Sequence, residues 1–278
     1  QCFKYGLTKI HLLLGYKADE IKNYFGSGRQ LNVQLIYHIE QYPLGTGGAI
    51  LNILEKLNDN FLIIYGDIYF KFNIYNFINF HYKKKAEATL FVHPNDHPYD
   101  SDIVVLKGNN RVTKILKKNT HNHLWTKNLV NAAIMIVEKK MLKKIQKIEF
   151  PFDLINDVFP NLIIKSKIYG YVNHSYVKDM GTTQRLQQVE KDIKNKVIEK
   201  ISDETKTPAI FLDRDGVINE ELGHIYHEKQ IKLIKNSAKA ISMINKMGFL
   251  AIVITNQPVI ARGECTKKKI KIIHDKLE

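Results

Sequence analysis

Short apolar runs alternate with amphipathic stretches from one end of the chain to the other. Brief runs of apolar residues bounded by Gly or charged residues predict buried strands, and apolar residues spaced three and four apart predict helices. The predicted strands are residues 10–14, 33–39, 61–65, 88–93, 103–106, 130–137 and 167–172. The predicted helices between them include residues 18–25, 47–57 and 182–195. Continuous apolar strands separated by helices predict an α/β fold with a parallel sheet covered on both faces.

A charged segment without aromatic residues interrupts this alternation at residues 191–207. The pattern then restarts with two strands, 209–213 and 249–255, and two helices, about 236–247 and 266–277. A chain of 278 residues is long enough for two domains. We therefore predict a first domain over 1–190, a linker over 191–207 and a second domain over 208–278.

The formal net charge of +14 raises the question of a nucleic-acid partner. Only five of the 42 basic residues are arginine, whose planar side chain is the one best suited to reading guanine. The lysine clusters, such as residues 83–85, are scattered and do not alternate with aromatic residues. The charge therefore predicts a solvated lysine surface and no nucleic-acid partner, with attraction to anionic substrates as the functional alternative.

The chain has no apolar stretch of the ~18 residues that a membrane span needs, and its first residues do not form a signal peptide. Cys2 and Cys265 alone cannot build a disulfide framework or a four-ligand zinc site. These features predict a cytoplasmic protein without a membrane partner. Because residue 1 is not Met, we expect the sequence to be part of a longer chain.

Two carboxylates, Asp213 and Asp215, follow the apolar run that opens the second predicted domain. Ligands of open α/β sheets bind at the carboxyl ends of strands. There one acid can attack a phosphorus atom while the other protonates the leaving group, with Mg²⁺ offsetting the repulsion between anions. The alternative is a turn that only caps the strand. Thr255 and Asn256 at the end of the next strand disfavour this alternative, because their hydroxyl and amide groups could hold phosphate oxygens at the same edge.

Residues 209–278 resemble the haloacid-dehalogenase superfamily, in particular the heptose bisphosphate phosphatases and their histidinol phosphatase relatives. The resemblance rests on FLDRDGVINEE at 211–221, on the 223–227 loop, on the Lys246–Phe249 turn and on TNQ with the later IARG. It implies a Rossmannoid fold and roles for five residues. These are Asp213 as nucleophile and magnesium ligand, Asp215 as acid/base and magnesium ligand, and Thr255, Asn256 and Arg262 as phosphate or substrate contacts.

The second domain also departs from that family. Pro258 and Val259 stand where the family usually has Ser-Gly. His224 and His227 either contribute to binding or are loop histidines without a role. The family's further magnesium ligands and its zinc loop would lie beyond Glu278. Zn²⁺ is therefore expected only in a later part of the chain.

The first predicted domain contains a glycine-rich turn, PLGTGGAI at 43–50, between a strand and a helix. Such turns let a ligand approach backbone amides. Asp67 follows the strand 61–65, and Asp179 stands at another strand end, in YVKDMGT. Two acids on separate strand ends can share a metal ion that neutralises a pyrophosphate leaving group. The alternative is that both aspartates only cap helices.

PLGTGGAI, YGD, Asn131-Ala132-Ala133 and DMGT occur in the order found in sugar-1-phosphate nucleotidyltransferases. Residues 1–190 are similar to that family, especially to guanylyltransferases acting on mannose or heptose phosphates. The resemblance implies a Rossmann-like domain with Asp67 and Asp179 as Mg²⁺ ligands. It also implies nucleotide or sugar contacts at Glu40, Gly45, Thr46, Gly47, Gly48, Asn131 and Asp153.

The first domain departs from its family at three points. Asp153 stands where the family prefers Glu, and Lys117 lies where it often has Glu-Lys-Pro. The family's first strand and phosphate-binding loop would precede residue 1, so we expect both domains to be incomplete and activity only from a longer chain.

The two resemblances together imply a bifunctional enzyme of sugar-nucleotide biosynthesis. It would remove the 7-phosphate of manno-heptose 1,7-bisphosphate and transfer GMP from GTP to D-glycero-D-manno-heptose 1-phosphate, on the way to lipopolysaccharide and other surface glycans. Three alternatives remain: an enzyme for another hexose 1-phosphate with a different phosphatase, a non-catalytic sugar-nucleotide-binding protein, and a nucleic-acid 3′-phosphatase with strongly salt-dependent DNA affinity.

Overall fold

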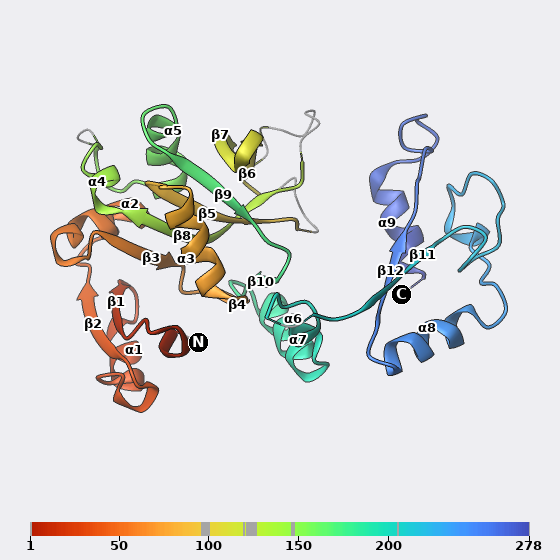
Figure 1. The fold of residues 1–278 in the computed structure, drawn as a ribbon, viewed down its shortest axis with the longest axis horizontal. Helices are drawn as coiled ribbons and strands as arrows, with labels where there is room; N and C mark the ends of the chain where they lie inside the picture. Colours follow the sequence, from red (N-terminus) through yellow and green to blue (C-terminus); the bar gives the residue numbers. More distant parts are fainter. Residues whose placement is uncertain are drawn as a thin grey trace. The chain divides into compact units, whose positions relative to one another are not determined.

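The computed structural model describes residues 2–95, 101–118, 120, 127–145, 148–204 and 206–277. The chain divides into two compact units, Gln1–Glu204 and Thr205–Glu278 (Figure 1). The expected α/β character is present in both, because strands and helices alternate along each of them.

The first unit contains strands and helices whose apolar positions match the sequence pattern. Its strands are β1 Lys9–Leu14, β2 Gln34–Ile39, β3 Asn60–Ile64, β4 Ile68–Lys71, β5 Ala88–His93, β6 Ile103–Lys107, β7 Arg111–Leu116, β8 Val130–Glu138, β9 Ile168–Val172 and β10 Tyr176–Asp179. Its helices are α1 Ala18–Phe25, α2 Gly45–Asn52, α3 Ile74–Lys83, α4 Lys139–Leu142, α5 Phe159–Leu162, α6 Thr183–Lys194 and α7 Val197–Lys200, with a π-helical turn at Leu154–Val158.

The predicted parallel sheet is wrong for the main sheet of this unit. Its strands run in the order β3-β8-β5-β9-β7-β6, and among these neighbours only β5 and β9 are parallel. Two further pairs stand apart from it: β1 with β2, which is parallel, and β4 with β10, which is antiparallel. Strands buried on both faces carry the same apolar runs whichever way their neighbours point, so the pattern could not reveal direction.

The main sheet is covered on both faces, as the apolar runs predict. On one face Leu90 and Met135 belong to a cluster that includes α2, the π-helical turn and α5. On the other face Phe91 and Ile134 pack with Phe77 of α3. Alternate residues of β5 and β8 therefore enter opposite cores, which fixes the register of the sheet at its centre.

The segment predicted as a linker over 191–207 belongs mostly to the first unit. Lys191–Lys194 complete α6, and α7 follows at Val197–Lys200. Ile198 is buried with Tyr176 and Val189, and Asp192 is buried as well. Charged composition suggested a linker, but apolar residues at helical spacing place one narrow face of this segment against β10.

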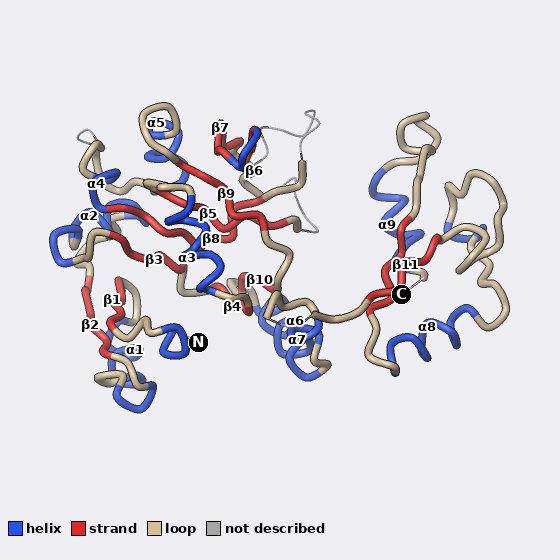
Figure 2. The backbone as a smooth tube through the Cα atoms, in the orientation of Figure 1, coloured by secondary structure: helices blue, strands red, loops and turns tan. Residues whose placement is uncertain are grey.

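The second unit is smaller and consists largely of loops (Figure 2). Its main elements are β11 Ala209–Asp213, α8 Ser237–Lys246, β12 Leu250–Ile254 and α9 Lys267–Asp275. β11 and β12 pair in parallel, with Asp213 opposite Ile254. A buried cluster joins Ile225, Ile231, Val259 and Cys265 to α9. By contrast, α8 has no buried residue, and Phe211 of β11 is exposed.

Candidate nucleotide and sugar site

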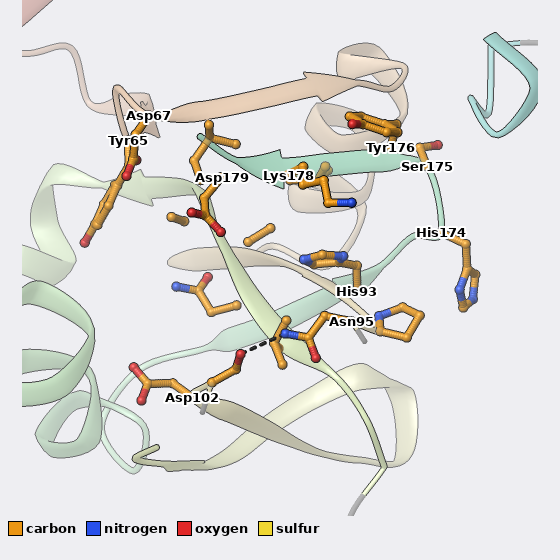
Figure 3. A pocket seen from close by; sticks show the side chains of 18 of the residues that line it. Tyr65, Asp67, His93, Asn95, Asp102, His174, Ser175, Tyr176, Lys178 and Asp179 are labelled. Atoms are coloured by element: carbon orange, nitrogen blue, oxygen red, sulfur yellow. Dashed lines mark hydrogen bonds between the residues drawn. The ribbon is translucent and has the colours of Figure 1, made fainter. Parts of the chain in front are cut away.

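A cavity of about 690 Å³ opens in the first unit where β3, β8 and β10 end or bend. Figure 3 shows Tyr65, Asp67 and Asp179 toward one end of it, with His93, Asn95 and His174 toward the other. Its lining includes Tyr65, Asp67, His93, Asn95, Ser101, Asp102, Lys118, Asn131, Ala133, His174, Ser175, Lys178 and Asp179. Such a volume is in the range of small-molecule sites in proteins.

The two aspartates predicted at strand ends meet at this cavity. Asp179 is the last residue of β10 and pairs with Ile68 of β4, while the backbone carbonyl of Asp67 accepts a hydrogen bond from Met180 at 2.7 Å. A Cβ atom at Gly181 would lie 3.4 Å from Asp67 Oδ2 and 3.6 Å from Asp179 Oδ1. The two carboxylates therefore flank the space beside Gly181, although 112 positions separate them in the sequence.

The alternative reading of both aspartates as helix caps does not hold. Thr182 caps α6 by accepting a hydrogen bond from the amide of Arg185. Asp179 instead accepts from the Arg185 guanidinium, with Nη1 2.6 Å from Oδ1, and the side chain of Asp67 is exposed beside it. Neither carboxylate therefore caps a helix.

This donor set fits Mg²⁺. The ion takes oxygen ligands and is usually held by one or two carboxylates together with substrate phosphates. Asp67 and Asp179 supply two carboxylates at the edge of a cavity large enough for a nucleotide. Among the residues that the structure describes there is no group of three or more His, Cys, Asp and Glu side chains that could hold a metal without such phosphates.

The glycine-rich turn packs closely against the segment around Phe152. Gly45 has φ +74°, and a Cβ atom there would lie 2.3 Å from the carbonyl oxygen of Phe152. Gly47 and Gly48 are buried, and added Cβ atoms would overlap the rings of Phe152 and Phe150. The amide of Gly47 also donates to the Phe152 carbonyl at 3.1 Å. Here the close approach that requires glycine is made by the protein's own chain.

Thr46 and Asp153 join the glycine-rich turn to the π-helical turn. The Thr46 hydroxyl donates to Asp153 Oδ2 at 2.7 Å and accepts from the Leu154 amide at 2.9 Å. The other carboxylate oxygen of Asp153 accepts from the amides of Ile155 and Asn156. Glu40 accepts from the Leu44 amide, which closes the start of the same turn. In this structure these predicted contact residues hold the turn in place.

Asn131 lines the cavity. Its Oδ1 is buried and has no hydrogen-bond partner within the described part of the chain. Ala133, two residues on, has φ +56°, an unfavourable conformation for a residue with a Cβ atom. The pairing of β8 with β5 shifts register between Met135 and Asn131, so Ala133 lies in a bulge of the strand.

Sequence reasoning missed several cavity residues. Asp102 accepts from the Lys118 amide at 2.9 Å and from Asn156 Nδ2 at 3.2 Å. Burial of Tyr65, with Asp153, Asp102 and Asp67 nearby, raises the pKa of its hydroxyl to about 12. Lys117 forms an ion pair with Asp157 at 3.8 Å, while its neighbour Lys118 lines the cavity. Asp102 and Lys118 lie in polar stretches of ordinary composition, so no sequence signal marked them.

The second unit brings most of its predicted site residues together. Asp213 ends β11 and is exposed, and Thr255 follows the end of β12. Gln257 Nε2 donates both to Thr255 Oγ1 at 2.7 Å and to Asp215 Oδ2 at 3.1 Å, which links the two strand ends. Asn256 is exposed next to them.

Asp215 is held more firmly than the sequence suggested. Arg214, which is 1% exposed, donates to both of its carboxylate oxygens, and Asn219 Nδ2 donates to Oδ1 at 2.9 Å. Burial opposes ionisation, but these hydrogen bonds outweigh it and keep the pKa of Asp215 below its usual value. Arg262 contacts His224, whose other neighbour is Glu264.

Comparison with known proteins agrees with the first unit. Residues 1–196 match the family model described as nucleotidyl transferase. This chain belongs to the nucleotidyl transferase family.

None of the described helices is both long and apolar enough to cross a membrane.

Two relatives carry names of sugar-1-phosphate guanylyltransferases. The mannose-1-phosphate guanylyltransferase of Mycobacterium tuberculosis is 32% identical over 179 residues, which cover 63% of this chain and 49% of that protein. The D-glycero-alpha-D-manno-heptose 1-phosphate guanylyltransferase of Aneurinibacillus thermoaerophilus is 28% identical over 193 residues, covering 69% of this chain and 81% of that protein. The chain thus spans about half the length of the first relative and most of the second.

Solved structures share the fold. HddC from Yersinia pseudotuberculosis, solved in complex with GMP-PN, has a TM-score of 0.59 at 22% identity and covers 69% of this chain and 81% of its own. A putative glucose-1-phosphate thymidylyltransferase from Bacillus anthracis also has a TM-score of 0.59, at 17% identity, and covers 68% and 78%. These likenesses support the mixed α/β nucleotidyltransferase fold of the first unit.

Proposed function

We propose that the first unit catalyses the transfer of GMP from GTP to a sugar 1-phosphate, with D-glycero-D-manno-heptose 1-phosphate as the preferred acceptor and mannose 1-phosphate as the alternative. The meeting of Asp67 and Asp179 beside Gly181, at the edge of a 690 Å³ cavity, carries this proposal. Family membership supports the reaction type, and the names of the two guanylyltransferase relatives support the base and the sugar.

The chemistry needs little covalent participation from the protein. An oxygen of the sugar 1-phosphate attacks the α-phosphorus of GTP, a new P–O bond forms, and the bond to the β-phosphate breaks to release pyrophosphate. Mg²⁺ bound at Asp67 and Asp179 would neutralise the phosphates that approach each other. The buried Asn131 carbonyl is a hydrogen-bond acceptor, which suits a sugar hydroxyl rather than a phosphate oxygen.

The test uses the protein as its native gene encodes it. GTP, ATP, UTP and dTTP are each combined with heptose, mannose and glucose 1-phosphates, and pyrophosphate and sugar nucleotide are measured. We expect GTP with heptose 1-phosphate to react fastest, and Asp67→Asn to reduce that rate by at least about 100-fold. Asp19→Asn is the matched control, because Asp19 is an exposed acid on α1. Binding of GTP without turnover would favour the non-catalytic alternative, and failure with every pair would overturn the proposal.

We further propose that the second unit hydrolyses a phosphate ester, the 7-phosphate of the heptose bisphosphate. The exposed Asp213 at the end of β11, with Thr255 beyond the adjacent strand, favours it. A carboxylate oxygen of Asp213 would attack phosphorus, the ester P–O bond would break, and water would then hydrolyse the aspartyl phosphate. Asp215 accepts hydrogen bonds on both oxygens, so acting as an acid requires that it first be released from Arg214.

Phosphate release from heptose 1,7-bisphosphate tests this second activity. Asp213→Asn is expected to abolish release and leave nucleotidyl transfer unchanged. Asp275→Asn, at the end of α9, serves as the control for loss of one carboxylate in the same unit. Equal release by wild type and Asp213→Asn would exclude the proposed nucleophile.

A further inference from the structure

Arg185 contacts one of the two proposed metal ligands from a helix that the sequence motifs did not mark. It lies in the first turn of α6, and its Nη1 is 2.6 Å from Asp179 Oδ1. The arginine side chain is 40% exposed and the aspartate side chain 30% exposed. The pair is thus half in solvent, where an ion pair adds little to folding stability.

The helix that carries Arg185 is anchored to a strand of the site. Asp192, further along α6, is buried and accepts hydrogen bonds at 2.7 Å from the Tyr176 hydroxyl and from Gln188. Tyr176 lies on β10, the same strand that ends in Asp179. The helix that carries the arginine is therefore fixed to the strand that carries the carboxylate.

The charge of Arg185 changes what the site attracts. Asp67 and Asp179 alone present two negative charges to the space beside Gly181, whereas the guanidinium on Asp179 offsets one of them. A bare divalent cation is drawn less strongly to the second arrangement. A magnesium–nucleoside triphosphate complex has a net charge of about minus two and is repelled less by it.

We propose that Arg185 is a positioning residue that biases the two-carboxylate site toward a metal–nucleotide complex and against the bare cation. The inference rests on the proposed nucleotidyl transfer. Arg185 orients the Asp179 carboxylate beside Asp67 before a ligand arrives, and its guanidinium then balances the phosphate charge that enters with the metal.

Two binding measurements on the full chain test the proposal. Electron paramagnetic resonance gives the affinity for Mn²⁺ alone, and calorimetry gives the affinity for Mg·GTP. We expect Arg185→Ala to bind Mn²⁺ about three- to tenfold more tightly and Mg·GTP about three- to tenfold more weakly. Arg185→Lys keeps the charge without the planar fork and should fall between the two proteins in both assays.

Lys191→Ala is the matched control, because it removes one positive charge from an exposed position on the same helix. Both of its affinities should stay within about twofold of wild type, since a solvated charge further away is screened. The melting temperature of Arg185→Ala should remain within about 3 °C of wild type. The inference would be overturned if Arg185→Ala changed both affinities in the same direction. It would also be overturned if the two affinities of Arg185→Ala equalled those of Lys191→Ala.

The two arms also separate this inference from the proposed function. Wild-type protein that binds Mn²⁺ but not Mg·GTP would count against nucleotidyl transfer. Tighter Mn²⁺ binding by Arg185→Ala would in that case still show that the guanidinium opposes the bare cation. If wild-type protein binds Mg·GTP normally and Arg185→Ala binds Mn²⁺ as tightly as wild type does, only the role of Arg185 would be refuted, and the proposed nucleotidyl transfer would stand.

Discussion

The two units each contain an arginine–aspartate pair at a candidate site, and the pairs differ in burial. Arg185 and Asp179 are separated by 2.6 Å with side chains 40% and 30% exposed, whereas Arg214 and Asp215 are separated by 2.7 Å with side chains 1% and 16% exposed. Nearly equal distances therefore describe a solvated pair in one unit and a desolvated pair in the other. Burial, rather than contact distance, decides what each pair does for stability.

The sheets that carry the two candidate sites also differ in size and in how much of them is covered. The first unit surrounds its site with a six-stranded sheet covered on both faces. Within the described residues of the second unit, β11 and β12 pair only with each other, and a two-stranded sheet has little stability by itself. We expect individual contacts near Asp215 to matter more to the second unit than the Asp179 pair does to the first.

Arg214→Met should have the largest effect. It leaves the Asp215 carboxylate without its buried counter-ion and should lower the free energy of unfolding of the second unit by about 3–5 kcal/mol. Hydrogen exchange of β11 and β12 amides measures this unit separately from the first. Arg262→Met, at an exposed arginine of the same unit, is the control and should change exchange little. Equal exchange in both variants would show that the buried Arg214–Asp215 pair stabilises the second unit no more than an exposed arginine does.

Gly45→Ala should destabilise the first unit by about 2–4 kcal/mol, because strain at φ +74° adds to overlap with the Phe152 carbonyl. Gly248→Ala in the second unit provides the comparison. That glycine has φ +85°, but nothing lies within 4 Å of an added Cβ atom, so only the strain of about 1 kcal/mol should appear. Urea titrations read by hydrogen exchange in each unit would measure both costs, and equal costs would contradict the difference in packing.

Glu204 should make the stability of the first unit depend on pH. Burial of its carboxyl opposes ionisation, but hydrogen bonds from Lys4, Tyr5 and Lys71 outweigh it and lower the pKa from 4.5 to about 2. Because the folded pKa is the lower one, the stabilisation is present above about pH 4.5 and is lost as the pH falls toward 2. After a discount for the exposed lysines it amounts to about 2 kcal/mol.

Thermal unfolding of Glu204→Gln between pH 7 and 2 checks this contribution. The variant should be less stable than wild type at pH 7 and approach it near pH 2. Glu20→Gln removes a largely exposed glutamate paired with Lys17 and should follow the wild-type curve. A constant difference between Glu204→Gln and wild type at all pH values would show that the carboxylate charge is not the cause.

Ala133→Gly should have the smallest effect and the opposite sign. Glycine adopts φ +56° without the Cβ strain, so the first unit should gain about 0.5–1 kcal/mol, or roughly 1–3 °C in melting temperature by calorimetry. Asn236 of the second unit has φ 70°, a conformation that asparagine tolerates. Asn236→Gly should therefore change stability by no more than a few tenths of a kcal/mol. A loss of stability in Ala133→Gly would mean that the alanine methyl group packs favourably at the cavity.

Local sequence pattern was sufficient for many elements and for the positions of the acids. The helix predicted at 18–25 is α1, the strand at 209–213 is β11 and the strand at 88–93 is β5, each with the same bounds. Asp179 and Asp213 were expected at strand ends and are the last residues of β10 and β11, whereas Asp67 lies in the turn between β3 and β4. Apolar periodicity and strand length are properties of short segments, so they can be read without knowing what the segment packs against.

Tertiary structure alone decided which segments meet. It made the main sheet mixed rather than parallel, added the short strand β4, and brought Asp67 and Asp179 to one cavity. It gave the glycine-rich turn a protein neighbour in Phe152 and placed Arg185 on Asp179. Such contacts join residues far apart in the chain, and they depend on how sheets and helices close around a core. No local pattern carries that information, because the same residues could pack equally well against a different segment of the chain.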